Sequence, residues 1–362
     1  MKGLYIHIPF CKTICSYCDF VKKVPYKNEI SEYMDALIKE IRTYSEYFSS
    51  IDTIYIGGGT PNLLGLVELE KLLYELREIN PIEFSIEINP DLYSFEFGKL
   101  LKKYGVNRIS LGVQSFNETN LSLLKRTHSK ENVYTVFESL TNLGFQNINI
   151  DMIFGIPGQT LSDLENDIDE VIRINPAHVS FYSLILENNT LLYHQYKYKG
   201  LSLVDEDTEA QMFNRVIDKL SKAGYTHYEI SNFCHRGFES KHNLKYWELE
   251  EYIGVGLGSS GFIDGIRTKN NRVISQYIKN TVYERIEQTP ADLIQDEMIF
   301  GLRKIDGVNI EKINQKYGID ILRKYEDIKK RIQDGLLEIV DGNLRLTKKG
   351  IFLGNQVFEI FV

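Results

Sequence analysis

The first half of the chain alternates between short apolar runs and longer segments whose apolar residues recur at helical spacing. The apolar runs predict strands at residues 3–9, 51–56, 83–88, 106–113, 145–154 and 179–186. Amphipathic segments between them predict helices at residues 29–47, 66–79, 95–104 and 161–174, with further helices up to residue 143. About six strand–helix repeats predict a parallel sheet with helical crossovers, either a (β/α) barrel or an open sheet. Polar residues and glycines gather just after the strands, so we expect a functional site at the carboxyl edge of the sheet.

Beyond residue 186 the pattern changes. Residues 205–223 predict an amphipathic helix, residues 225–230 a short strand, and the glycine-rich stretch around residues 254–261 an irregular segment. From residue 291 onward the pattern predicts three helices and then a hairpin around Asp341 and Gly342, a dipeptide typical of tight turns. Helices followed by such a hairpin are typical of a small winged-helix unit. We therefore expect three parts: an α/β core over residues 1–200, an extension over 201–290, and a mainly helical, winged-helix-like domain over 291–362.

Composition narrows the classes of function. The 362 residues are 43% hydrophobic and 25% charged, which is typical of a soluble globular protein. The net charge of −8 argues against non-specific nucleic-acid binding, and we expect no specific nucleic-acid partner. The first residues contain no apolar run long enough for a signal peptide, and no stretch approaches the ~20 apolar residues of a membrane helix. We therefore expect a cytoplasmic protein.

Three of the four cysteines form a tight cluster, Cys11, Cys15 and Cys18, with C-x3-C-x2-C spacing. Clustered thiols in a reducing compartment indicate metal rather than disulfides. A [4Fe–4S] cluster held by three thiolates keeps one iron open to a further ligand. Two alternatives remain at this point: a zinc site completed by a fourth ligand such as His7, and a redox pair made by Cys15 and Cys18.

Several polar residues near the ends of the predicted strands are candidates for binding a small ligand. The sequence Gly57-Gly58-Gly59-Thr60-Pro61 follows the second strand, and glycines let a backbone approach a ligand closely. Glu87 is an acid in an apolar strand, and such a carboxylate needs a partner. Further candidates are Gln114, Arg126, His128 and Asp151. Each of them alone is as well explained by a structural role, and their joint placement after successive strands is what indicates a site.

The cysteine spacing directly after the first strand of a β/α array resembles the radical S-adenosylmethionine (SAM) superfamily. The resemblance implies that the amino and carboxylate groups of SAM chelate the open iron, and that the reduced cluster cleaves SAM to a 5′-deoxyadenosyl radical. It also implies a partial (β/α) barrel of about six repeats. The zinc and redox-pair readings become less favoured in this context.

Longer motifs resemble one branch, the oxygen-independent coproporphyrinogen III oxidase-like (HemN-like) proteins. They are Tyr-Ile-His-Ile-Pro-Phe-Cys from residue 5, Gly-Gly-Gly-Thr-Pro, Gly-Val-Gln-Ser-Phe, and Ile-Asp-Met-Ile-Phe-Gly-Ile-Pro-Gly-Gln-Thr from residue 150. The likeness extends to Arg-Leu-Thr-Lys-Lys-Gly from residue 345, so it covers essentially the whole chain. By motif, it implies SAM contacts from Tyr5, Tyr17, Gly58, Gly59, Thr60, Glu87, Gln114, Arg126 and Asp151.

Two departures favour a sister group, the HemW-type haem chaperones. The chain begins at the first strand, where the oxidases carry an extension, and it has Asp19 and Phe20 where they carry a fourth cysteine. The segment His-Asn-Leu-Lys-Tyr-Trp at residues 242–247 matches the H-N-x-x-Y-W motif associated with haem in that group. The haem-binding candidates implied are His242, Asn243, Tyr246 and Trp247.

The side chains of this motif allow two interpretations. An imidazole is a common axial ligand of haem iron, and aromatic rings offer flat apolar surface to a porphyrin. The structural alternative has His242 hydrogen-bonded within a loop, with Tyr246 and Trp247 filling the junction between domains. Cys234 and His235 lie nearby in the sequence and are alternative ligands.

The leading hypothesis is a haem chaperone that uses a [4Fe–4S] cluster, SAM and haem and delivers haem to apo-haem proteins such as respiratory cytochromes. The resemblance leaves room for transient membrane association and for a homodimer. The second hypothesis is a radical SAM enzyme that decarboxylates a porphyrinogen oxidatively, so whether the protein is an enzyme stays open. Nucleic-acid binding through the C-terminal domain is the third and least favoured.

Overall fold

A single curved sheet organises most of the molecule. The computed structural model describes residues 1–26 and 28–362, and in them twelve strands follow the order β12-β11-β10-β9-β1-β2-β3-β4-β5-β6-β8-β7. The first six strands along the chain are β1 (Lys2–Ile8), β2 (Ile51–Gly58), β3 (Glu83–Ile88), β4 (Arg108–Gln114), β5 (Asn147–Phe154) and β6 (His178–Ser183). They pair in parallel from β1 to β6, which confirms the predicted β/α array.

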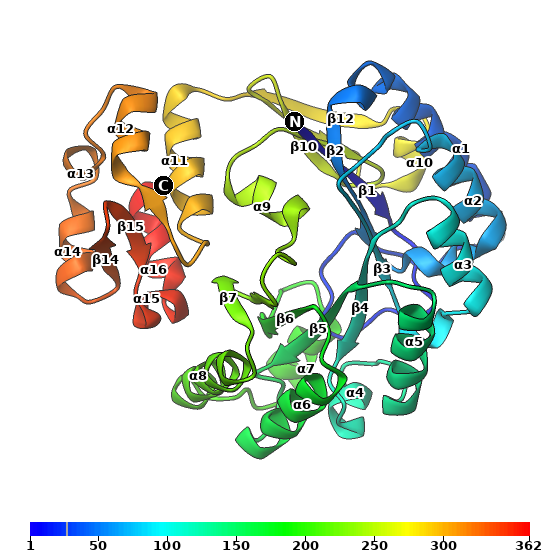
Figure 1. Cartoon of the computed structure of the whole chain (residues 1–362), viewed down its shortest axis with the longest axis horizontal. Helices are drawn as coiled ribbons and strands as arrows, with labels where there is room; N and C mark the ends of the chain where they lie inside the picture. Colours follow the sequence, from blue (N-terminus) through cyan, green and yellow to red (C-terminus); the bar gives the residue numbers. More distant parts are fainter. Residues whose placement is uncertain (27) are drawn as a thin grey trace.

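Helices cover the outer side of this sheet (Figure 1). They are α1 (Glu29–Thr43), α2 (Gly65–Glu75), α3 (Phe95–Lys103), α4 (Glu118–Leu123), α5 (Lys130–Asn142) and α6 (Leu161–Ile174). Short 3-10 helices lie at Ser45–Ser50, Pro61–Leu63, Pro90–Leu92 and Glu359–Phe361. The predicted helix over residues 29–47 is therefore shorter, because the chain tightens into a 3-10 turn after Tyr44.

The two faces of the sheet differ in polarity. On β1, Leu4, Ile6 and Ile8 are buried in the core beneath the helices, while Tyr5 and His7 lie on the opposite face. The same alternation continues along β2 to β6, where the second face carries, in strand order, Thr53, Tyr55, Glu83, Ser85, Glu87, Arg108, Ser110, Asn149, Asp151, His178 and Ser180. Buried parallel strands are usually apolar on both faces. Because this second face is polar, we expect the functional site on the inner side of the curved sheet.

The sheet continues beyond both ends of the six repeats. After α7 (Leu191–Lys199) and α8 (Glu206–Lys222), β7 (Thr226–Glu229) and β8 (Asn232–Cys234) extend it from β6. After α9 (Lys241–Trp247), β9 (Tyr252–Val255) runs parallel to β1 on its free side. Next come β10 (Ser260–Ile263), β11 (Ile266–Asn270), α10 (Ile274–Tyr277) and β12 (Val282–Glu287). The stretch predicted to be irregular therefore contains strands, and this part of the prediction was wrong.

The C-terminal part has its own small sheet and core. Helices α11 (Pro290–Gly301), α12 (Ile310–Tyr317), α13 (Ile321–Lys324) and α14 (Asp327–Gln333) precede the hairpin of β14 (Leu337–Val340) and β15 (Asn343–Leu346). Strand β13 (Val308–Asn309) pairs with β15, and α15 (Lys348–Phe352) and α16 (Gly354–Phe358) follow. The predicted turn is present, with positive φ at Asp341 (50°) and Gly342 (79°), as a tight hairpin requires. The boundaries at residues 200 and 290 stay predictions.

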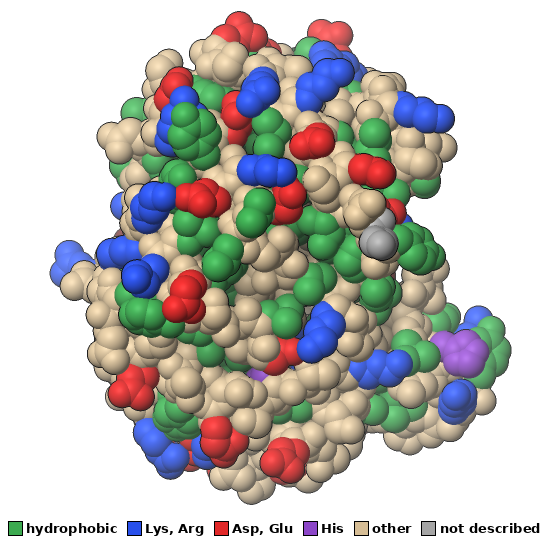
Figure 2. Space-filling model, turned by 90° about the vertical axis from the view of Figure 1, so that its right-hand side faces the viewer, with side chains coloured by type: hydrophobic (Ala, Val, Ile, Leu, Met, Phe, Trp, Pro, Cys, Tyr) green, Lys and Arg blue, Asp and Glu red, His purple; other side chains and the backbone are tan. Residues whose placement is uncertain are grey.

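The face that carries α1, α2 and α3 mixes basic and acidic side chains without a large patch of one sign (Figure 2). No helix within residues 1–26 and 28–362 combines the length and apolar character needed to cross a membrane.

Candidate functional site

The cysteine loop follows β1 and is tied to its surroundings by backbone hydrogen bonds. The amide of Cys11 donates to the carbonyl of Lys23 at 3.0 Å, and Lys23 donates back to Pro9 at 2.8 Å. Ser16 is anchored on both sides, because its hydroxyl donates to Leu123 at 2.7 Å and its carbonyl accepts from Leu192 at 2.8 Å. The loop that carries the three thiols is thus fixed between β1, the end of α4 and the start of α7.

The three thiols of the loop differ in burial. Cys11 is buried, and Cys15 and Cys18 are half-buried. No group of three or more His, Cys, Asp or Glu side chains in residues 1–26 and 28–362 converges closely enough to hold one metal ion. Burial raises the pKa of Cys18 to about 11, so that thiol is protonated near neutral pH until a metal displaces the proton.

His7 is not free to complete the triad. Its Nδ1 pairs with the hydroxyl of Tyr5 at 2.8 Å and its Nε2 with the carbonyl of Val21 at 2.7 Å. Burial lowers its pKa, which keeps the ring neutral, and both nitrogens are occupied. The ring therefore connects β1 to the end of the cysteine loop instead of offering a metal ligand.

The glycines after β2 are required by close packing. Gly58 has φ 113°, and a Cβ there would lie 2.5 Å from the ring of His7. A Cβ at Gly59 would lie 2.8 Å from the backbone of Pro9 and Phe10. The amide of Gly59 also donates to Ile8 at 2.7 Å. Glycine is thus needed where the end of β2 passes the start of the cysteine loop.

Two acids lie close together on the inner face of the sheet. Glu87 accepts from the hydroxyl of Tyr55 at 2.8 Å and from the amide of Gly58 at 3.0 Å. Asp151 accepts from Ser110 at 2.8 Å and Asn149 at 2.9 Å. Burial, and then the negative charge of Asp151, raises the pKa of Glu87 to about 7. Such a carboxyl changes its protonation readily when a cation or a hydroxyl group binds beside it.

Arg126 joins the cysteine loop to β3 and β4. Its Nη1 lies 3.7 Å from the sulfur of Cys15, and its Nη2 donates to Asn89 at 3.0 Å and to the carbonyl of Gly112 at 2.6 Å. Its buried Nε has no partner among the described residues. A cation in this position suits a carboxylate ligand.

Gln114 and Thr60 lie around the same guanidinium. Gln114 ends β4 with the unusual φ of 68°, and a Cβ at Gly112 would lie 3.1 Å from its side-chain nitrogen. Thr60 lies beside the thiol of Cys11, and its hydroxyl accepts from Asn89 at 3.4 Å. Sequence reasoning missed Asn89, although its position directly after β3 and before Pro90 was a signal. The structure brings together the residues expected around SAM, with Tyr17 packed between Ile153, Ile156 and neighbouring apolar side chains.

The H-N-x-x-Y-W segment forms the short helix α9, whose first turn is capped by an acid from β3. The amides of Lys241 and His242 donate to the two oxygens of Glu83, each at 2.9 Å. Ser240 is the N-cap and accepts from the amide of Asn243 at 3.4 Å. The helix is therefore fixed to the amino-terminal end of β3.

His242 is fully engaged within the protein. Only 1% of it is exposed, its Nδ1 pairs with Thr53 at 2.9 Å, and its Nε2 pairs with the hydroxyl of Tyr246 at 2.8 Å. Burial lowers its pKa to about 3, so the imidazole is neutral and uses one nitrogen as donor and the other as acceptor. In this arrangement no nitrogen of His242 is available to iron.

Tyr246 and Trp247 instead line a cavity of about 400 Å³, which we call the aromatic hollow. Its lining consists of Tyr5, Tyr246, Trp247, Leu249, Glu250, Tyr252, Ser260, Arg267 and Phe300. The rings of Tyr246 and Tyr252 meet edge to face at 4.7 Å between centroids, and the guanidinium of Arg303 lies 4.5 Å above Trp247. Small-molecule sites are typically apolar cavities of ~300–1,000 Å³ with a few polar groups.

The remaining candidates lie away from the aromatic hollow or are buried within their own elements. Cys234 is buried within β8. The Nε2 of His235 pairs with Asn175 at 3.0 Å, and its ring stacks on Tyr225 at 4.2 Å. The two ring nitrogens of His128 are buried and have no partner among the described residues.

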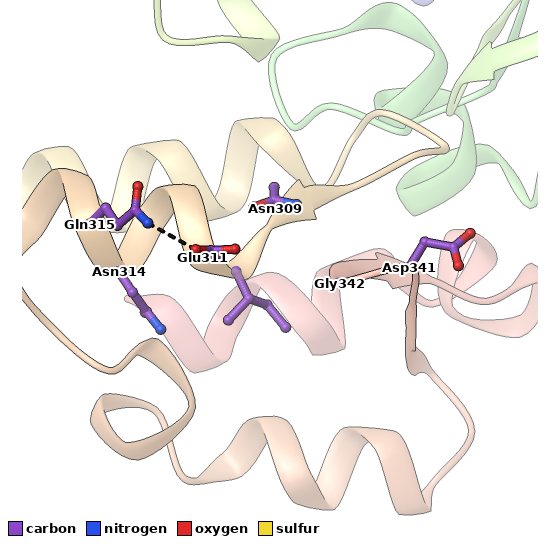
Figure 3. A pocket seen from close by; sticks show the side chains of 7 residues that line it. Asn309, Glu311, Asn314, Gln315, Asp341 and Gly342 are labelled. Carbon is purple, nitrogen blue, oxygen red and sulfur yellow. Dashed lines mark hydrogen bonds between the residues drawn. The ribbon is translucent and has the colours of Figure 1, made fainter.

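A cavity of about 570 Å³ on the C-terminal part is lined mainly by residues with polar side chains, and these side chains make contacts with neighbouring residues of the same part (Figure 3). Gln315 donates to Glu311 at 2.9 Å, Asn309 caps α12, and Asn314 accepts from the amide of Ile321 at 2.8 Å. These side chains serve their own helices and do not converge on a common point.

Models of known families match two regions of the chain. The radical SAM superfamily matches residues 5–171, and the HemN C-terminal domain matches residues 288–353. The solved structure of coproporphyrinogen III oxidase (HemN) from Escherichia coli aligns with a TM-score of 0.86 and 24% identity, over 99% of this chain and 89% of that one. The fold and the site together define a radical SAM protein, a class that implies a [4Fe–4S] cluster and SAM.

The similar curated proteins are named haem chaperone HemW. The protein from Lactococcus lactis is 42% identical over 100% of this chain and 97% of its own length. The protein from Bacillus subtilis is 40% identical over 100% of this chain and 99% of its own. The chain belongs to the HemW family of radical SAM proteins.

Proposed function

We propose that this protein is a haem chaperone: it binds a [4Fe–4S] cluster, SAM and haem, and delivers haem to apo-haem proteins such as respiratory cytochromes. The relatives that cover the whole chain carry the name haem chaperone, which supports this class of function over a porphyrinogen oxidase. The reducing conditions that the three free thiols need fit a cytoplasmic location.

Cys11, Cys15 and Cys18 are the proposed cluster ligands. Their loop is anchored by backbone hydrogen bonds at both ends, and Arg126 beside Cys15 supplies positive charge where thiolates form. When bound and reduced, such a cluster supplies an electron to SAM. The residues proposed to hold SAM are Tyr5, Tyr17, Gly58, Gly59, Thr60, Glu87, Gln114, Arg126 and Asp151. Among them, Arg126 suits the carboxylate of SAM, and Glu87 suits an amino or hydroxyl group.

The aromatic hollow is the observation that supports haem binding. It places the rings of Tyr246 and Trp247 in one cavity with Tyr5, which is also a proposed SAM contact. Aromatic rings give a porphyrin flat apolar surface, and Arg267 on the wall suits a propionate group. His242 and Asn243 belong to the same motif and hold α9 in place.

Anaerobic reconstitution tests the cluster. Wild-type protein and the Cys234→Ser variant are expected to take up iron and sulfide in equal amounts, whereas Cys15→Ser is expected to lose the cluster. Cys234 is a matched control because it is a buried thiol outside the loop. Iron and sulfide analysis with optical spectra is the measurement, and zinc in place of iron would contradict the proposal.

Haem titration of the full-length protein tests the chaperone. We expect a saturable Soret shift that Trp247→Ala weakens about tenfold or more. Phe95→Ala on the surface of α3 should leave it unchanged. Haem should then pass to an apo-cytochrome. Absence of haem binding would contradict the proposal, and SAM-dependent conversion of coproporphyrinogen III would favour the oxidase instead.

A further inference from the structure

The aromatic hollow raises the question of which side chain ligates the haem iron, and this question rests on the proposed haem-binding function. Protein ligands of haem iron are the side chains of His, Cys, Met and Tyr. Among the residues that line the hollow, tyrosine is the only one of these types: Tyr5, Tyr246 and Tyr252. The histidine of the motif is not part of the wall.

His242 would have to break two contacts to reach the iron. It is hydrogen-bonded on one side to Thr53 and on the other to Tyr246, and its ring lies 5.4 Å from that of Tyr55. The helix cannot easily turn to release it, because Glu83 caps its first two amides. The contact that His242 makes toward the hollow is with the hydroxyl of Tyr246, so it fixes the direction of that ring.

Two of the three phenols in the wall are already paired with imidazoles. Tyr5 is hydrogen-bonded to His7 and Tyr246 to His242, each at 2.8 Å. Ligation of iron by either oxygen would disturb the contact between β1 and the cysteine loop or the contact that holds α9. Tyr252 is not paired in this way.

Tyr252 has an arginine as its positively charged neighbour. In the antiparallel part of the sheet, Tyr252 of β9 lies opposite Phe262 of β10, which lies opposite Arg267 of β11. The three side chains therefore share one face, and the guanidinium of Arg267 lies 5.2 Å above the ring of Phe262 and close to the hydroxyl of Tyr252. Asp296 at 2.5 Å and Gln288 at 3.1 Å hold the guanidinium in place.

We propose that Tyr252 supplies the axial oxygen ligand of haem iron in the aromatic hollow, with Arg267 beside it, and that His242 is a positioning residue that holds Tyr246. On binding ferric haem, the phenol forms an oxygen–iron bond and its proton passes to the solvent, without a change in oxidation state. A neighbouring cation stabilises the phenolate oxygen that remains. The histidine of the motif thus acts through Tyr246 and not on the metal.

The test compares ferric-haem spectra of full-length variants. Wild type and His242→Gln are both expected to give high-spin, phenolate-type optical and electron paramagnetic resonance spectra, but His242→Gln should bind haem more weakly because Tyr246 loses the partner that positions it. Tyr252→Phe should lose that signature and bind haem about tenfold more weakly or worse. Tyr252→His should bind haem with an imidazole-type spectrum instead, a change of ligand that a merely structural role would not produce. Tyr283→Phe, at an exposed tyrosine of β12, is the matched control.

The outcomes separate this inference from the function on which it rests. If wild-type protein binds no haem, the proposed function fails. If haem binds, but His242→Gln removes the axial signature while Tyr252→Phe leaves it intact, only this inference is overturned. Circular dichroism and melting curves of each variant establish that a lost signature does not reflect unfolding.

Discussion

At the scale of single residues, close packing between Gly58 and His7 joins the end of β2 to the start of the cysteine loop. The backbone of Gly58 has φ 113°, outside the regions that side chains adopt, and its missing side chain leaves room for the imidazole. His7 in turn connects Tyr5 in the aromatic hollow to Val21 in the cysteine loop. One glycine thus maintains the contact between the two parts of the site.

We predict that Gly58→Ala destabilises the protein by about 2–4 kcal/mol, because backbone strain and a clash with the His7 ring add up. Gly65→Ala is the matched control: its φ is 73°, but nothing lies within 4 Å of the added carbon. That change should cost only about 1 kcal/mol. Urea unfolding of the cluster-free protein measures the free energy of unfolding of both variants. Equal losses of stability would show that the clash with His7 is relieved at no cost.

The positions of the candidate residues could be predicted largely from the sequence, because most of them lie in or directly after a strand that its apolar run predicts, while their roles stay predictions. Glu87, Gln114, Arg126 and the three cysteines were named in this way, and the structure places all of them around the carboxyl edge of the sheet. The partners of His242 could not be predicted, because Thr53 and Glu83 lie at least 150 residues earlier in the chain. Only the tertiary fold brings them together.

At the scale of elements, the six β/α repeats were predictable and the strands after them were not. Strands β1 to β6 carry β-branched and aromatic runs, whereas β9 and β10 carry glycines that weaken a strand prediction. These glycines are there because the two strands approach closely: a side chain at Gly254 would overlap the carbonyl oxygen of Ser260. The close packing that requires glycine therefore also makes these two strands hard to predict from the sequence.

The first two amides of helix α9 have one acid of another element, Glu83, as their acceptor, which makes the stability of the helix testable. We predict that Glu83→Ala loosens α9, because the amides of Lys241 and His242 lose their acceptor. Trp247, the only tryptophan of the chain, reports this as a red shift of its fluorescence, and amide exchange over residues 241–247 should speed up about tenfold or more.

Glu83→Gln is the matched variant, because it keeps one acceptor oxygen near the same amides. It should fall between wild type and Glu83→Ala in both measurements. Unchanged exchange in the alanine variant would mean that packing of Tyr246 and Trp247, and not the cap, holds the helix.

At the scale of the whole molecule, the chain has two large hydrophobic cores. One lies between the sheet and its outer helices and includes Leu111, and the other lies in the C-terminal part and includes Leu344. Both leucines are fully buried. The aromatic hollow is lined from both parts, by Tyr252 of the sheet and Phe300 of α11.

We predict that Leu344→Ala removes about 2–5 kcal/mol from the C-terminal part while leaving the sheet protected. Amide exchange should rise over residues 290–362 and stay low over β1 to β6. Leu111→Ala, a matched deletion in the other core, should expose β3, β4 and β5 instead. Equal loss of protection everywhere in both variants would mean that the two cores unfold as one unit.

Strand β1 lies between β2 and β9, although β9 begins at Tyr252 and β1 ends at Ile8. On the ribosome, the amino-terminal strand and the thiols that follow it emerge long before the strand that covers their other edge. At ~5–20 residues per second, the roughly 240 intervening residues keep that edge open for about 12–50 seconds. An unpaired edge is prone to wrong pairing, so the nascent chain needs protection during this interval. We therefore expect a cluster bound by this loop to be loaded after synthesis of the sheet, when the loop has its final anchors.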